Sequence, residues 1–273
     1  MVGKLFVVGT PIGNLGDFSP RAVETLSSCD FIAAEDTRVT IKLLNHFGIK
    51  KPMVSYYEHN KAGRGNQIIE RILNGETCAL VSDAGMPAIS DPGEELVKTA
   101  RENGIEIEAV PGPSAVITAL SISGMPSRRF CFEGFLSANK NERKAHLQEI
   151  KNEKRTLIFY EAPHKLVSTL KDLYAFFGDR KVSVVKELTK IHETVLNATL
   201  SEICEYYNEN TPKGEFVIIV EGKEEQKTEY TLTDAINIAE KLIAEGQAMS
   251  SAAKEAAAIT GIKKGDIYKA VLK

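Results

Sequence analysis

The 273-residue sequence contains no tryptophan and only four cysteines. These cysteines lie far apart at Cys29, Cys78, Cys131 and Cys204 and form no Cys-x-x-Cys pair, which argues against a structural zinc site. Buried thiols in a reducing compartment are the simpler interpretation, so we expect a cytoplasmic protein with no metal. No apolar run reaches membrane-spanning length, and the first residues show no signal-peptide pattern.

Neither sign of charge dominates. The 34 Lys and Arg residues against 37 Asp and Glu residues give a formal net charge of −3, which argues against a protein coated in basic surface. The hydrophobic fraction of 43% is ordinary for a globular chain. The length is sufficient for two packed domains, each with its own core.

Three short apolar runs end in loops rich in glycine and proline. The loops are Gly9-Thr10-Pro11, Ser82-Asp83-Ala84-Gly85 and Pro111-Gly112-Pro113-Ser114. Short apolar runs bounded in this way predict buried strands. Because ligands in open α/β sheets bind outside the carboxyl ends of the strands, the three loops predict a small-molecule cleft.

Strand and helix patterns alternate through the first part of the chain, which predicts a parallel sheet. In this part Ser19 is expected to cap a helix that begins at Pro20. A helix over Ala115–Ser123 is expected to lead into a second part. The strands predicted there are Phe130–Phe135, Thr156–Tyr160, Val182–Lys186 and Phe216–Val220, and the helices are Asn141–Lys151, Leu166–Phe177 and Ser201–Asn208.

The charged segment Glu221–Lys227 is typical of a solvated linker. The helical tail beyond it is too short to be predicted as an independent domain. Within the tail, a turn at Gly261 and a basic second helix resemble a helix-turn-helix unit that contacts nucleic acid; a helical hairpin docked on the body is the alternative. We expect an N-terminal α/β domain over 1–113, a second α/β domain over 114–222 and a helical extension over 230–273.

Several polar segments are candidates for chemistry. The first loop, Gly9–Gly16, matches neither Gly-x-Gly-x-x-Gly nor the P-loop, which argues against a classical nucleotide site. Asp83 could bind a ligand that carries an amine, or it could accept local backbone amides in an Asx turn. Glu35 and Asp36 could accept a proton from a hydroxyl while Arg38 binds a phosphate; an ion pair with a helix cap is the structural alternative.

A modest basic surface is expected between Lys140 and Arg155, where six basic residues face three acidic ones. It could meet phosphates, although a solvated helix face has the same composition. His59 adds a titratable side chain in a polar segment, where a histidine is more often solvated than catalytic.

Longer motifs stand in a characteristic order along the chain. They are LFVVGTPIGN (5–14), AEDTR (34–38), VSDAGMPAISDPG (81–93), VPGPSA (110–115), FEGFL (132–136), FYEAPHK (159–165), KELT (186–189) and GEFV (214–217). On these motifs the chain resembles the ribosomal RNA small-subunit methyltransferase I family. That family lies within the tetrapyrrole-methylase-like class of S-adenosylmethionine enzymes.

The resemblance implies a two-domain α/β fold, with a parallel N-terminal domain, a mixed-sheet second domain and a small helical tail. It implies a homodimer that holds S-adenosylmethionine between its domains. The implied reaction is methyl transfer to the ribose 2′-oxygen of a cytidine in the decoding region of 16S ribosomal RNA, with the small ribosomal subunit as partner. The implied donor-binding residues are Pro11, Asp83, Ala84, Gly85, Ser114, Tyr160, Leu188, Gly214 and Glu215.

For catalysis we expect Asp36 or Glu35 to act as the base. The expected substrate contacts are Arg38, His59, Arg129, Lys140 and Arg143. Members of the wider class carry Gly-x-Gly-like and Gly-Asp-Pro loops, whereas this chain has Gly-Thr-Pro and Ser-Asp-Ala-Gly, which favours an RNA acceptor. Two alternatives stay open: a precorrin-like tetrapyrrole C-methyltransferase, and a non-enzymatic nucleic-acid-binding ligand sensor.

Overall fold

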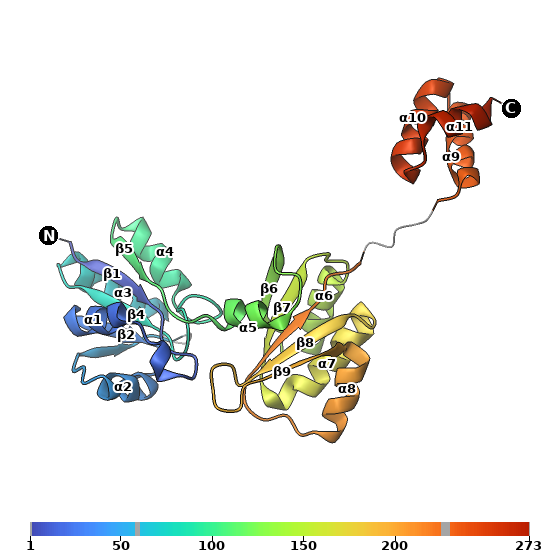
Figure 1. Ribbon diagram of the computed structural model, residues 1–273. Helices are drawn as coiled ribbons and strands as arrows, with labels where there is room; N and C mark the ends of the chain where they lie inside the picture. Colours follow the sequence, from blue (N-terminus) through green and yellow to red (C-terminus); the bar gives the residue numbers. More distant parts are fainter. Residues whose placement is uncertain (1, 58–60, 225–229, 273) are drawn as a thin grey trace. The chain divides into compact units, whose positions relative to one another are not determined.

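The computed structural model describes residues 2–57, 61–224 and 230–272. The chain divides into two compact units, residues 1–223 and residues 224–273 (Figure 1). The larger unit contains two five-stranded sheets. Within the described ranges, none of the helices combines the length and the apolar character needed to cross a bilayer.

The first sheet is parallel throughout, as predicted, and has the strand order β3-β2-β4-β1-β5. Its strands are β1 (Lys4–Val8), β2 (Phe31–Ala34), β3 (Met53–Ser55), β4 (Cys78–Val81) and β5 (Glu106–Val110). Because β1 pairs with both β4 and β5, the three glycine-rich loops that follow these strands leave the sheet side by side.

Helices cover both faces of this sheet (Figure 1). They are α1 (Pro20–Ser28), α2 (Thr37–His46), α3 (Lys61–Leu73) and α4 (Glu94–Glu102). A short 3₁₀ helix, η1 (Leu15–Asp17), precedes α1 and has no buried residue. Strand side chains alternate between two cores: Phe31 and Leu80 pack with residues of α3 and α4, whereas Ile32 packs with residues of α1 and α2. At the start of α1, the Ser19 side chain accepts the Ala22 N–H at 3.1 Å, which confirms the predicted cap.

The second sheet is mixed, with the order β6-β7-β10-β8-β9. Its strands are β6 (Phe130–Phe135), β7 (Thr156–Glu161), β8 (Lys181–Lys186), β9 (Thr194–Thr199) and β10 (Phe216–Val220). Only β6 and β7 pair in parallel. Strand β9 was not predicted, because this half-exposed edge strand pairs with β8 alone and carries no continuous apolar run.

The two faces of the second sheet also pack against different helices. Helix α5 (Ala115–Ser123) covers one face through Val116 and Leu120. The other face packs against α6 (Lys140–Ile150), α7 (Pro163–Phe177) and α8 (Leu200–Glu209). Helix α7 begins three residues earlier than predicted, with Pro163 in its first turn, a position that suits proline because the missing N–H has no partner there.

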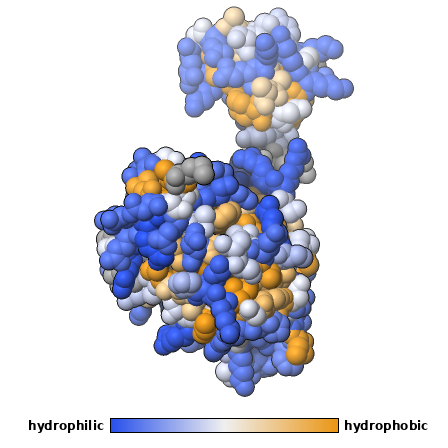
Figure 2. Space-filling view, turned by 90° about the vertical axis from the view of Figure 1, so that its left-hand side faces the viewer, coloured by the Kyte–Doolittle hydropathy of each residue, from blue (hydrophilic) through white to orange (hydrophobic). Residues whose placement is uncertain are grey.

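The smaller unit consists of α9 (Leu232–Ala244), α10 (Met249–Thr260) and α11 (Lys264–Val271). Its core is built largely from alanines, with Ile267 fully buried among them. The tail therefore has a core of its own, contrary to the expectation from its length. On its visible face, Figure 2 shows hydrophobic side chains bordered by hydrophilic ones. The division of the larger unit into domains 1–113 and 114–222 stays our proposal.

Candidate functional site

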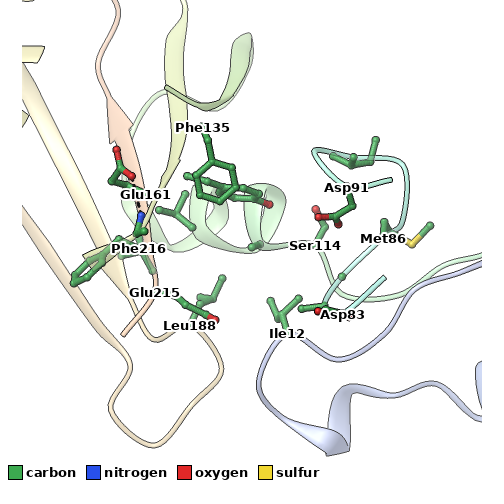
Figure 3. Close-up of a pocket in the computed structure, with 18 of the residues that line it drawn as sticks. Ile12, Asp83, Met86, Asp91, Ser114, Phe135, Glu161, Leu188, Glu215 and Phe216 are labelled. Atoms are coloured by element: carbon green, nitrogen blue, oxygen red, sulfur yellow. Dashed lines mark hydrogen bonds between the residues drawn. The ribbon is translucent and has the colours of Figure 1, made fainter. Parts of the chain in front are cut away.

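A cavity of about 370 Å³ lies between the loops of the first sheet and the second sheet. This volume falls within the range of roughly 300–1,000 Å³ that is usual for small-ligand sites. Figure 3 shows Ile12, Asp83 and Asp91 facing side chains of the second sheet across the cavity. The second sheet and its neighbouring loops contribute Phe135, Tyr160, Glu161, Ala162, Pro163, Val185, Leu188, Glu215, Phe216 and Val217.

Most residues predicted to bind the methyl donor line this cavity. They are Asp83, Ala84, Gly85, Ser114, Tyr160, Leu188 and Glu215. Pro11 and Gly214 do not line it, but each directly precedes a residue that does, Ile12 and Glu215. The fold therefore brings the predicted residues of the first sheet and those of the second sheet to one cavity. The binding role of each residue stays a prediction.

Main-chain contacts hold the loops of the first sheet together. Thr10 N–H donates to the Gly85 carbonyl at 2.9 Å, and Gly85 N–H donates to the Thr10 carbonyl at 3.1 Å. A Cβ atom added to Gly112 would lie 2.7 Å from Gly9 Cα, so this approach is open only to glycine. Contacts between main-chain atoms therefore hold the glycine-rich loops in place beside the cavity.

Carboxyl groups and apolar side chains line the cavity. The acidic residues are Glu35, Asp83, Asp91, Glu161 and Glu215, and no Lys, Arg or His stands among the described residues that line it. Burial raises the pKa of Asp91 to about 6; the Ser82 hydroxyl opposes this rise and the Asp83 charge adds to it. Burial likewise raises the pKa of Glu35, followed by the nearby charge of Asp91. Such a lining suits a cationic ligand and disfavours a polyphosphate.

The two carboxylates predicted as bases differ in their environment. Glu35 lines the cavity, whereas Asp36 is not among the lining residues and caps α2 by accepting the Arg38 N–H at 2.8 Å. The Arg38 guanidinium lies 2.6 Å from the Asp36 carboxylate, and this hydrogen bond lowers the Asp36 pKa to about 2. The structural alternative of a helix cap with an ion pair therefore describes Asp36.

The predicted RNA contacts differ in how far solvent reaches their side chains. Arg129 and Lys140 are exposed, and the Arg38 side chain is 88% exposed. His59 lies outside the described residues. Arg143 is the correction: its side chain is only 8% exposed, because its Nε atom lies 2.7 Å from Asp172 Oδ2 and Nη2 donates to Thr169 Oγ1 at 3.0 Å. Its guanidinium binds α7 and is not presented to a phosphate.

Sequence reasoning missed two acidic residues of the cavity, Asp91 and Glu161. Asp91 belongs to a Ser-Asp pair at 90–91 that repeats the pair at 82–83, and this repetition was the available signal. Glu161 is buried, accepts the Ala162 N–H at 2.8 Å and accepts the Thr169 hydroxyl. No local pattern distinguishes it from an ordinary strand end.

Solved structures share this fold. A diphthine synthase aligns with a TM-score of 0.63 at 17% identity, covering 81% of this chain and 90% of its own. The uroporphyrin-III-C-methyltransferase from Thermus thermophilus aligns with a TM-score of 0.57 at 18% identity, covering 80% of this chain and 94% of its own. At such identities the likeness concerns the fold alone.

Sequence comparisons reach further. Residues 4–204 match the family of Tetrapyrrole (Corrin/Porphyrin) Methylases. Proteins named ribosomal RNA small subunit methyltransferase I are 50% identical in Xylella fastidiosa, over 97% of this chain and 98% of that one, and 46% identical in Synechocystis sp., over 98% and 96%. The so-named protein of Thermotoga maritima is 46% identical and is covered completely by 223 residues, or 82% of this chain. The chain therefore belongs to the tetrapyrrole methylases and, within them, to the ribosomal RNA small subunit methyltransferase I family.

Proposed function

We propose that the protein transfers the methyl group of S-adenosylmethionine to the 2′-oxygen of a cytidine ribose in 16S ribosomal RNA. The cavity carries the proposal, because its described lining joins apolar side chains with five carboxyl residues and no basic one. The donor bears a sulfonium and an ammonium group, and carboxylates stabilise such cations. The names of the relatives support ribosomal RNA as the acceptor.

The residues present fit this donor. In our proposal the Asp83-Ala84-Gly85 loop and Ser114 hold it from the first sheet, and Tyr160, Leu188 and Glu215 hold it from the second. Pro11 and Gly214 shape the adjoining turns. When bound, the donor supplies an electrophilic methyl group on a positively charged sulfur. The remaining task of the chain is to align the acceptor oxygen with that carbon and to exclude water.

The RNA backbone needs a different surface. Phosphates are repelled by an acidic cavity, so we propose that they lie outside it, on exposed Arg38, Arg129 and Lys140. Each such contact releases counterions, and binding of the small subunit should weaken steeply as salt rises. We further propose that the protein acts as a homodimer in the cytoplasm.

Incubation with methyl-labelled donor and small ribosomal subunits that lack this modification tests the proposal. Nuclease digestion should place the label on one ribose 2′-oxygen. Asp83→Ala should lower labelling at limiting donor and regain it at high donor. Confirmed donor binding with no transfer to RNA would refute the proposal, and transfer to a precorrin-like acceptor instead would establish the tetrapyrrole alternative.

A further inference from the structure

An open cleft adjoins the cavity described above. We call it the outer cleft; its lining comprises Tyr57, Ala88, Ser90, Pro92 and Glu94 together with two residues of the cavity. These two are Glu35 and Asp91. Among the described residues, no other side chain lines both hollows, so this pair forms the wall between them.

We propose that Asp91 is the general base of the reaction and that the acceptor nucleotide enters through the outer cleft. The inference rests on the proposed function. Methyl transfer requires the donor carbon and the acceptor oxygen to approach within about 3–3.5 Å, although they belong to different molecules. A group that borders both hollows is placed to reach that point of contact.

The proton balance of the reaction requires such a group. As the bond forms between the 2′-oxygen and the methyl carbon, the carbon–sulfur bond breaks and leaves its electron pair on sulfur. The hydroxyl proton passes to a carboxylate oxygen of Asp91, which becomes neutral. The products are a 2′-O-methyl ribose and a neutral thioether.

Asp91 suits this role better than its neighbours do. Asp36 is bound to Arg38 and does not line the cavity. One oxygen of Glu35 is oriented toward the Asp83 N–H at 3.4 Å. Burial raises the pKa of Asp91 to about 6, which leaves it ionised at neutral pH yet able to hold a proton.

The backbone around Asp91 is held in an unusual conformation. Ala88 and Ser90 are non-glycine residues with φ of 66° and 63°. The same loop lies close to strand β6. A Cβ atom added to Gly134 of that strand would lie 3.3 Å from Ser90 Oγ. The loop that carries Asp91 is therefore packed against the second sheet.

The surroundings of Asp91 set the sign of its pH dependence. No Lys, Arg or His lines either hollow within the described part of the chain, so Asp91 has acidic and phenolic neighbours there. The titratable residues that line the two hollows with it are Glu35, Tyr57, Asp83, Glu94, Tyr160, Glu161 and Glu215. Ionised carboxylates around it hold a proton on Asp91 to higher pH, and removing one of them should lower its pKa.

The test compares Asp91→Asn with Glu35→Gln and with Asp179→Asn, a carboxylate remote from the cavity that binds Ser201. Single-turnover methylation of small subunits is measured at saturating donor from pH 5 to 8. Donor affinity is measured by calorimetry. Independently of activity, carbon NMR follows the titration of the Asp91 carboxyl in the donor-free protein.

We expect Asp91→Asn to lose about 10²- to 10⁴-fold in rate, a loss far larger than the accompanying change in donor affinity. The wild-type rate should fall at acid pH, with an inflection at or below the pKa that NMR gives for the donor-free protein, because the positive charge of the bound donor favours the ionised carboxylate. Glu35→Gln should lose less than tenfold and shift the inflection to lower pH, and Asp179→Asn should match the wild type.

Three results would overturn the assignment. One is Asp91→Asn with near-normal turnover. Another is a loss in Glu35→Gln as large as that in Asp91→Asn. The third is an Asp91 carboxyl that titrates near its ordinary pKa. Binding of donor by the wild type without any transfer to RNA would instead refute the proposed function, and the assignment with it.

Discussion

Asp91→Asn should stabilise the folded protein at neutral pH. The raised pKa means that the folded state disfavours the ionised carboxylate, with burial as the main cause. This effect is absent below the unfolded pKa near 3.8, and stability is lost as the pH rises through the folded value of about 6. An asparagine of the same shape carries no charge and avoids the loss.

The magnitude follows from the difference in pKa. A rise from 3.8 to about 6 corresponds to at most about 3 kcal/mol, at about 1.4 kcal/mol for each tenfold change in proton affinity. Because solvent reaches Asp91 from the outer cleft, we reduce this to on the order of 1 kcal/mol. In a domain of this size, that gain raises Tm by about 2–4 °C.

Thermal unfolding of the variant and the wild type from pH 4.5 to 8 measures the effect. The difference in Tm should be about a third of its full size at pH 4.5, because the unfolded carboxyl is already largely ionised there, and should reach a plateau above pH 7. Asp179→Asn is the control of opposite sign, because a backbone hydrogen bond from Ser201 lowers the Asp179 pKa and its charge stabilises the fold at neutral pH. The reasoning would be refuted if Asp91→Asn were less stable than the wild type at pH 8, or if the difference in Tm between them did not change with pH.

Other outcomes follow from contacts elsewhere in the chain. Arg143→Met should lower the free energy of unfolding by about 2 kcal/mol in a denaturant titration, because the pair with Asp172 is buried on one side, while the salt dependence of RNA binding stays unchanged. Gly112→Ala should weaken donor binding at least tenfold by calorimetry, since its Cβ would lie 2.7 Å from Gly9 Cα. Gly65→Ala is the matched control and should not weaken it, because its Cβ would make an ordinary contact of 3.7 Å with Tyr56. Removing residues 224–273 should preserve donor affinity and reduce small-subunit affinity in a filter-binding assay. If the truncated and the full-length protein bind the small subunit equally well, the tail has no role in RNA binding.

Features that depend on local sequence patterns were predicted, whereas features that depend on contacts between distant segments were not. The parallel sheet was predicted from the alternation of strand and helix patterns, and the three glycine-rich loops lie side by side because β1 pairs with both β4 and β5. The edge strand β9 was missed because its pairing with β8, and not its own composition, keeps it in the sheet. Asp91 was missed because its importance depends on two hollows that only the folded chain creates.

Arg143 illustrates the opposite error. In the sequence it belongs to a run of basic residues, and its neighbour in that run, Lys140, is exposed as expected. One helical turn later, Arg143 points toward α7 and meets Asp172. Composition counts both residues as positive charge, whereas helical geometry separates a residue that solvent can reach from one that it cannot.

The contact between Gly9 and Gly112 allows the support of the cavity and its ligand specificity to evolve independently. Where main chain rests on main chain, the shape of the support does not depend on which side chains the rest of the cavity carries. Substitutions in the second sheet can then change which ligand the cavity binds without disturbing the packing of the first-sheet loops. A scaffold of this kind tolerates wide divergence, and proteins only 17–18% identical to this chain still share its fold.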